Sequence, residues 1–391
     1  MAQEKKRYYF DWAATALPHK NILNNVINPN LNNILANPSS QHFEGREAKH
    51  ALEMAREKCA NVLGVKPDTL YFTSGGTESN GIILSSLIIK NVMKQNKGRI
   101  LYSAVEHPSI RENCLMLERL GFPLNIIPVE KDGCINPQSL ENLIQKNPDT
   151  RFAAIMAVNN ETGAIMDMDT LCKTIRQNQK APIHVHCDLV QALGKTQVNI
   201  KAWDLDSASV SAHKLGGPRG IGLLYLKKPV EVLLKGGQES GIRPGTENTY
   251  GAIALSELIE RLASPEMVQN ESQKATERFG HLIRSLKAME RCSLLPEDRM
   301  EKDKRFSPWI LQLRFFGIPG EVMLRALDKE GFAVSTGSAC SSAAQERPVL
   351  AAMGLDEKAR LEGIRISQGI CTTMEEVYAL LKAIEKVLEF L

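Results

Sequence analysis

The chain has 391 residues, of which 43% are apolar and 24% are charged, as in an ordinary globular protein with a substantial core. Its 48 basic and 45 acidic side chains leave a net charge of +3, so composition gives no reason to expect nucleic acid or a membrane surface as the main partner. The eight cysteines are scattered without a CxxC pair, which favours reduced thiols over a disulfide framework or a zinc site. We therefore expect no metal centre.

The N-terminal residues lead directly into Tyr8, Tyr9 and Phe10 without the apolar stretch of a signal peptide. No apolar run approaches the ~18 residues that a membrane-spanning helix needs. Together with the scattered cysteines, these features favour a cytoplasmic location.

Between about residues 50 and 225, short apolar or β-branched runs alternate with helical patterns. This alternation is typical of a mostly parallel sheet that is covered by helices, an α/β architecture. The candidate strands are 70–73, 99–104, 125–128, 152–158, 182–187, 207–211 and 222–226.

A mostly helical stretch runs from Thr246 to about Met289 and leads into a region of mixed pattern, with candidate strands at 309–314 and 332–335. Thr372 and Thr373, answered by Glu375 and Glu376, can cap a last helix. Its buried face is predicted to carry Val377, Leu380, Leu381, Ile384, Leu388 and Leu391. We place a large domain at residues 14–258 and a small one at residues 1–13 and 259–391.

In an open parallel sheet, ligands gather beyond the carboxyl ends of the strands. The turn Gly75-Gly76-Thr77 follows the run 70–73 and opens a helix, where free N–H groups suit a phosphate. His107 follows the next run and can lie flat on a ligand ring, and Asn159 follows the run 152–158. Taken one at a time, these residues leave the alternatives of a plain helix start, a structural histidine and a turn asparagine open.

Asp188 follows the apolar run 182–187 and is predicted to lie at the buried end of a central strand. An isolated carboxylate there costs several kcal/mol unless a cation or strong donors meet it. A protonated pyridine nitrogen is such a cation, and a structural Arg or Lys is the alternative partner.

Lys214 ends the run Ser211-Ala212-His213-Lys214, directly before a glycine-rich turn. This layout places one amine just beyond the carboxyl end of a strand, among hydrogen-bond donors that can hold a phosphate. An enzyme that holds pyridoxal phosphate as a Schiff base needs a lysine in such a place. A solvated surface lysine is the alternative that the run by itself leaves open.

Together these residues resemble the pyridoxal-phosphate cysteine desulfurases, a group of the class V aminotransferase family with the fold-type I architecture. The likeness runs from Tyr9-Phe10-Asp11 through residues 37–42 to Gly369 and the helix after it, nearly the whole chain. It implies a large domain with a mostly parallel seven-stranded sheet, a smaller α+β C-terminal domain that carries a catalytic cysteine loop, pyridoxal 5'-phosphate as cofactor, and a homodimer.

The resemblance also implies residue roles. Lys214 would carry the cofactor, Asp188 would pair with its ring nitrogen, and His107 would stack on the ring and take part in catalysis. The phosphate would be held by Gly76, Thr77, Ser211 and His213, and by Thr246 of the partner subunit. Asn159 and Gln191 would approach the phenolic oxygen. Arg365 and Asn159 would bind the substrate, and the planar guanidinium of Arg365 suits its carboxylate.

Cys340 lies in the small-residue run 335–342, which reads as an exposed loop, whereas a structural cysteine prefers apolar neighbours. Its Ser-Ala-Cys-Ser-Ser context is similar to the long-loop branch that serves iron–sulfur assembly and nitrogen fixation. The resemblance implies conversion of L-cysteine to L-alanine, with a persulfide left on Cys340 for a protein acceptor such as an iron–sulfur cluster scaffold. The sequence leaves the identity of the acceptor open.

A selenocysteine lyase, or another class V lyase with the same ring chemistry, is the nearest alternative function. A noncatalytic scaffold with this fold is a more remote one. The chain departs from the usual family pattern at Trp12, Leu189, Lys235, Ser240 and Ile370, which leaves substrate preference and turnover open.

Overall fold

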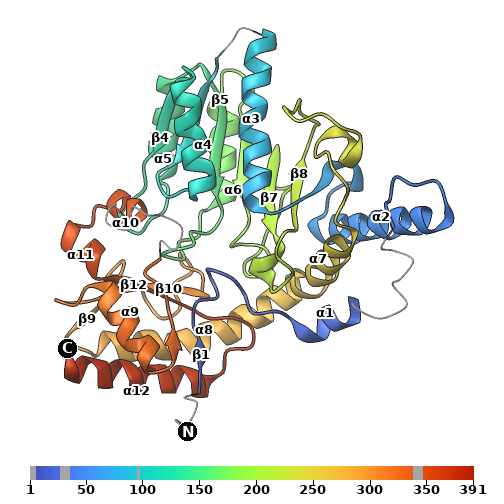
Figure 1. Cartoon of the computed structure of the whole chain (residues 1–391). Coiled ribbons are helices and arrows are strands. Elements are labelled where there is room, and N and C mark those ends of the chain that lie inside the picture. Colours follow the sequence, from blue (N-terminus) through green and yellow to red (C-terminus); the bar gives the residue numbers. More distant parts are fainter. Residues whose placement is uncertain (1–5, 27–35, 95–96, 338–346) are drawn as a thin grey trace.

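The computed structural model describes residues 6–26, 36–94, 97–337 and 347–391 of the chain. Its largest element is a seven-stranded sheet (Figure 1) in which neighbouring strands are parallel, except that β8 is antiparallel to both of its neighbours. The order across the sheet is β2 (Leu70–Thr73), β8 (Gly222–Leu226), β7 (Ser207–Ser211), β6 (His184–Asp188), β5 (Thr150–Met156), β3 (Arg99–Ser103) and β4 (Leu124–Ile127). The predicted α/β architecture with a mostly parallel sheet is confirmed.

The predicted strands agree closely with this sheet because buried strands carry short runs of apolar or small residues. The runs 70–73, 207–211 and 222–226 coincide with strands, and the other four differ only at their ends. The direction of β8 was not predicted. Its connection from β7, residues 212–221, holds only the short 3-10 helix η3 (Ala212–Leu215) and no crossover helix, so the chain returns antiparallel.

Helices cover both faces of the sheet because successive strand residues point to opposite faces. On β5, Phe152 and Ala154 belong to one core, whereas Ala153 and Ile155 belong to another. The first core includes α3 (Gly76–Lys94) and α4 (Pro108–Arg119). The second includes α1 (Lys20–Val26), α2 (Phe43–Leu63), α5 (Pro137–Lys146), α6 (Met168–Asn178) and α7 (Thr249–Leu262).

A further core joins Phe10 to the C-terminal part of the chain. Its three-stranded antiparallel sheet has the order β12 (Gly363–Ser367), β10 (Ile310–Phe315) and β9 (Cys292–Leu294). In Figure 1 this region lies below the large sheet, with α8 (Pro265–Lys287), α9 (Gly320–Lys329) and α12 (Met374–Phe390) around it. The parallel pair β1 (Tyr8–Tyr9) and β11 (Phe332–Ala333) ties the N-terminal segment to it, and α10 (Pro348–Ala352) and α11 (Glu357–Glu362) precede β12.

The C-terminal predictions needed more correction. β9 and β12 were missed: β9 is only three residues long, and β12 carries Arg365 within a wholly buried strand. The helical stretch after Thr246 consists of two helices, α7 and α8, that part at residues 263–264. Thr373 and Glu376 form the capping box of α12, while Thr372 instead accepts a hydrogen bond from the N–H of Gly369.

The predicted buried face of α12 is correct for Val377, Leu380, Leu381 and Ile384. It is wrong at Leu391, which is 48% exposed because the helix ends at Phe390, just before it. The domain boundaries at residues 13–14 and 258–259 stay a prediction. Among the helices of the described residues, none combines the length and the apolarity that crossing a membrane requires.

Candidate active site

A cavity of about 540 Å³ lies at the carboxyl ends of the large sheet's parallel strands. Its wall comes from the last residues of β5, β6 and β7, from the turns after β2, β3, β5, β6 and β7, from residues 13–15 of the N-terminal segment, and from residues 337, 348, 349 and 365 of the C-terminal part. The large sheet and the C-terminal region therefore both contribute to it. The predicted site residues that line it are Gly76, Thr77, His107, Asp188, Gln191, Ser211, His213, Lys214 and Arg365.

Lys214 lies in η3, directly after β7, so the end of that strand carries its amine to the cavity. Its Nζ donates to the carbonyl oxygens of Ala13 at 2.6 Å and Ala14 at 2.7 Å. Gly216 ends the turn with φ of 78°, and a Cβ there would lie 2.7 Å from the carbonyl oxygen of Leu17. A glycine is needed at that position.

Asp188 is the last residue of β6 and is only 6% exposed. Its Oδ1 accepts from the N–H of Val190 at 2.9 Å, and its Oδ2 accepts from Nδ2 of Asn80 at 3.0 Å. Within the described part of the chain, these amide donors are its partners, and no arginine or lysine forms an ion pair with it. A buried carboxylate held this way suits a cationic ligand.

His107 caps α4, and its Nδ1 accepts from the backbone N–H of Ser109 at 3.1 Å. Because that donor is an N–H group, Nδ1 carries the lone pair. The hydroxyl of Ser109 lies 2.8 Å from the same nitrogen. Burial lowers the pKa of His107 despite the opposing charge of Asp188. The ring is therefore neutral at pH 7, with its proton on Nε2.

The turn after β2 forms a cradle at the start of α3. A Cβ on Gly76 would lie 2.6 Å from Cγ2 of Val190, so only glycine leaves the backbone this open. The side chains of Ser211, His213 and Arg219 line the same cavity. Burial, with the charges of Lys214 and Arg219, lowers the pKa of His213 to about 4. Such a positive environment at a helix N-terminus favours an anion.

Gln191 connects the N-terminal segment to a lysine that the sequence did not single out. Its Nε2 donates to the carbonyl oxygen of Ala13 at 2.9 Å, and its Oε1 accepts from Nζ of Lys195 at 3.1 Å. Desolvation and the charges of Lys214 and Arg365 lower the pKa of Lys195 to about 7. In the sequence, the only indication that Lys195 belongs to the site was its position four residues after Gln191.

Arg365 comes from β12, on the opposite side of the cavity, and is 2% exposed. One of its terminal nitrogens donates to the carbonyl oxygen of Asn160 at 2.8 Å, and the other pairs with Asp11 at 2.8 Å. Its buried Nε makes no hydrogen bond within the described residues. The guanidinium thus keeps donor capacity for an anionic group in the cavity.

Two predicted residues are not part of this wall as far as the structure describes it. Asn159 is fully buried behind it, where Nδ2 donates to Val105 and Oδ1 accepts from the N–H groups of Glu161 and Thr162. Thr246 is exposed on the loop before α7. Cys340 lies outside the described residues. The roles of all three stay predictions.

Two acidic residues of the wall were not predicted as site residues. Glu106 is buried, with Oε1 accepting from the N–H of Met156 at 2.6 Å, while Oε2 has no partner among the described residues. Burial and the charge of Asp188 raise the pKa of Glu106 to about 8. Burial also raises the pKa of Glu161. The position of Glu106 directly before His107 was the available signal.

The family described as "Aminotransferase class-V" matches residues 8–380. The chain belongs to the class-V aminotransferase family. This membership agrees with the resemblance noted from the sequence. Of the five departures from the usual family pattern, Leu189 is a core residue and Trp12 packs against Gly369, so neither replaces a group in the cavity wall.

Among its relatives in this family, the chain is similar to the protein named "Cysteine desulfurase IscS" of Dictyoglomus turgidum, with 37% identity over 98% of the chain and 95% of the relative. A protein of the same name from Methanosarcina thermophila is 33% identical over 100% of the chain and 94% of the relative.

Solved structures of the family agree. A NifS-like protein superposes with a TM-score of 0.89 at 33% identity, over 98% of this chain and 100% of the other. The structure described as SspA in complex with cysteine has a TM-score of 0.76 at 30% identity, over 93% of this chain and 98% of the other.

Proposed function

We propose that the chain is a pyridoxal-phosphate-dependent cysteine desulfurase, which converts L-cysteine to L-alanine and keeps the sulfur as a persulfide on Cys340. The observation that carries this proposal is the gathering of Lys214, Asp188, His107 and Arg365 around one cavity. The names of relatives over nearly the full chain support it.

The residues of the cavity fit the cofactor on four counts. An amine from Lys214 can hold its aldehyde carbon, and the carboxylate of Asp188, which lacks a cationic partner within the described chain, can meet its protonated ring nitrogen. The cradle at Gly76 with Ser211 and His213 suits the phosphate. The neutral ring of His107 offers an apolar face to the pyridine ring. Gln191 offers an amide N–H for the phenolic oxygen.

When bound, pyridoxal phosphate supplies an electron sink that lets bonds at the substrate Cα break. Nζ of Lys214, which now donates to two backbone carbonyls, holds the cofactor and then takes and returns the proton at that carbon. Asp188 keeps the positive charge at the ring nitrogen in place. Nε2 of His107, which carries the proton of the neutral ring, can donate a hydrogen bond to a group in the cavity.

Arg365 binds the carboxylate of the substrate. Its guanidinium is fixed by Asn160 and Asp11, so it does not have to be ordered when the substrate arrives. This contact selects an α-amino acid and orients its side chain.

Cys340 receives the sulfur in this proposal. Its thiolate attacks the substrate sulfur, so that the new S–S bond forms as the Cβ–S bond of the substrate breaks. The carbon fragment leaves as alanine after protonation. Gly337 and Pro348, on either side of the segment that holds Cys340, both line the cavity. These two described residues thus lie at the site, close in sequence to Cys340.

We further propose that the enzyme acts as a cytoplasmic homodimer, in which Thr246 of the partner subunit reaches the phosphate. The exposed position of Thr246 on its own chain supports this. A protein sulfur acceptor, such as an iron–sulfur cluster scaffold, would then take the persulfide sulfur.

Purified full-length protein with added pyridoxal phosphate tests the function. We expect a visible absorbance band from the bound cofactor and release of alanine from L-cysteine. Equal or faster release of alanine from L-selenocysteine, without a persulfide from L-cysteine, would favour a selenocysteine lyase instead. A colourless protein that releases no alanine would refute both enzymatic functions, and the noncatalytic scaffold would be the remaining alternative.

A further inference from the structure

A chain of hydrogen bonds runs from Asp188 into the interior of the protein, away from the cavity. It passes through Asn80 on α3, then His186 on β6, then Ser207 on β7, and ends at His184. Asn80, His186 and Ser207 are fully buried, so water does not compete for these bonds. Of these hydrogen-bonded residues, the function proposed above uses only Asp188.

The direction of the first bonds follows from what each group can do. The carboxylate of Asp188 can only accept, so the Asn80 nitrogen that lies 3.0 Å from its Oδ2 donates. The amide of Asn80 is thereby oriented, and its Oδ1 must accept from Nε2–H of His186 at 2.9 Å. His186 therefore carries a proton on Nε2.

The tautomer of His186 sets the remaining directions. Burial lowers the pKa of His186 to about 3, so the ring is neutral and its Nδ1 accepts from the hydroxyl of Ser207 at 2.8 Å. That hydroxyl oxygen then accepts from Nε2–H of His184 at 2.7 Å. Burial lowers the pKa of His184 to about 4. In this relay of His184, Ser207, His186, Asn80 and Asp188, each of the four hydrogen bonds is therefore donated in the direction of Asp188.

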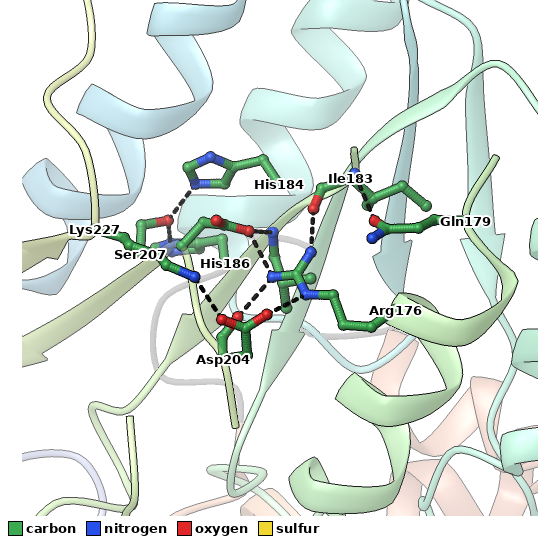
Figure 2. A network of polar contacts seen from close by, with 10 residues as sticks. Arg176, Gln179, Ile183, His184, His186, Asp204, Ser207 and Lys227 are labelled. Atoms are coloured by element: carbon green, nitrogen blue, oxygen red, sulfur yellow. Dashed lines mark hydrogen bonds and ion pairs between the residues drawn. The ribbon is translucent and has the colours of Figure 1, made fainter. Parts of the chain in front are cut away.

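The surroundings hold both histidine rings in place. Phe152 stacks on His184 with ring centroids 5.5 Å apart and on His186 with centroids 6.3 Å apart. Figure 2 shows His184, Ser207 and His186 beside Arg176, which donates to the carbonyl oxygen of Ile183, the residue before β6. The hydrogen-bonded side chains are therefore carried by packed elements, α3, β6 and β7.

Asn80 is also linked to His107, the second ligand-facing group of the site, through the hydroxyl of Ser109. Its Nδ2 donates to the hydroxyl oxygen of Ser109 at 2.8 Å, which leaves the proton of that hydroxyl for Nδ1 of His107. One buried amide therefore stands behind both Asp188 and His107.

We propose that Asn80 is a positioning residue that, with His186, Ser207 and His184 behind it, holds Asp188 in its anionic form toward the cofactor. The inference rests on the proposed function for the identity of that cofactor. Hydrogen bonds to a charged group are the strongest kind, and aligned bonds polarise one another. Without the donor from Asn80, the anionic form loses one of its two hydrogen bonds, and the proton it shares with the ring nitrogen shifts toward the carboxylate.

The first experiment measures the ¹⁵N chemical shift of the ring nitrogen of ¹⁵N-labelled pyridoxal phosphate bound to the full-length protein. We expect a protonated nitrogen in the wild type and a shift toward the unprotonated form in Asn80→Ala. The cofactor should bind about 10-fold more weakly or worse, as for loss of one hydrogen bond to a charge. Ser86→Ala is the matched control on α3, since its hydroxyl donates to the carbonyl oxygen of Ile83 in the same helix and has no other partner among the described residues, and it should change neither readout.

Ser207→Ala is a milder second variant, in case Asn80→Ala does not fold. It breaks the relay farther from the cavity, so it should move the ring-nitrogen shift in the same direction by a smaller amount. Unchanged shifts in the folded variants would overturn the proposal.

A measurement without cofactor separates this inference from the proposed function. In ¹⁵N-histidine-labelled full-length protein at pH 7, His186 should be neutral with its proton on Nε2. A proton on Nδ1, or a cationic ring, overturns the relay whether or not the cofactor binds. Failure of the wild type to bind pyridoxal phosphate, by contrast, would refute the proposed function.

Discussion

Lys214 and Gln191 donate hydrogen bonds to the same atom, the carbonyl oxygen of Ala13. That oxygen lies in the N-terminal segment, which the β1–β11 pair ties to the C-terminal region. The segment therefore fixes the amine proposed to carry the cofactor and the amide proposed to contact it. Because 201 positions separate Lys214 from Ala13, only the tertiary fold can bring this about.

Lys214→Ala should abolish covalent attachment of pyridoxal phosphate, because no other amine at the site is proposed to hold it. After addition of the cofactor and borohydride reduction, intact-mass spectrometry should show the adduct on the wild type and none on the variant. Lys386→Ala removes an exposed lysine that pairs with Glu330 on the surface, and this control should retain the adduct. An adduct of undiminished yield on Lys214→Ala would contradict the assignment.

The raised pKa of Glu106 makes stability depend on pH. The carboxyl keeps its proton up to about pH 8 in the folded protein, whereas an unfolded chain releases it near its ordinary value of 4.5. The unfolded state thus binds fewer protons between these values, and stability falls as pH rises through this window, by on the order of a few kcal/mol. Glu106→Gln keeps the shape of the protonated acid and should lose this part of the decline.

Urea unfolding of both proteins at pH 5 and pH 8 measures the effect. The wild type should lose more of its free energy of unfolding between the two values than Glu106→Gln does. Equal losses would mean that Glu106 is ionised in the folded protein at pH 5.

Glu239 forms a buried ion pair with Arg56, with contacts of 2.8 and 2.9 Å, and also accepts from the N–H of Phe72 on β2. Glu239→Gln leaves a buried cation without its full partner and should lower the free energy of unfolding by on the order of 3 kcal/mol. Glu231→Gln removes an exposed pair with Lys235 and should change it by less than about 0.5 kcal/mol. Chemical denaturation of both variants decides, and similar losses would rule out the special role of the buried pair.

Arg365→Lys keeps the positive charge but loses the planar donor pair. We expect kcat/KM for L-cysteine to fall about 10- to 100-fold, while the absorbance of bound cofactor stays unchanged, since Arg365 is proposed to bind only substrate. Steady-state alanine release and the visible spectrum check this prediction. Loss of the cofactor band in a folded Arg365→Lys protein would place this residue at the cofactor instead.

Much of the large sheet was predictable because its strands are short runs of apolar, β-branched or small residues between turns. The runs 207–211 and 222–226 gave strand ends that match the structure. Arg365 shows the limit: a charged residue in the middle of β12 hid a wholly buried strand, because its partners Asp11 and Asn160 come from elsewhere in the chain.

Which residues face the cavity was predictable where a residue lies at the carboxyl end of a strand, as Asp188 does, or in the turn that follows one, as Lys214 does. The residues behind them were not, because their roles depend on partners far along the chain. Asn80 looks like an ordinary helix residue, yet its amide meets Asp188 at a separation of 108 positions. Asn159 bonds the backbone of its own turn, an explanation that the sequence had left open.

The most direct test of the proposed function is mass spectrometry of the peptide that contains Cys340, after brief incubation of cofactor-loaded protein with L-cysteine. We predict one added sulfur atom on Cys340 for each alanine released in the first turnover, and Cys340→Ala should keep the cofactor band but form no persulfide. Alanine and sulfide release from Cys340→Ala at the wild-type rate would contradict the account.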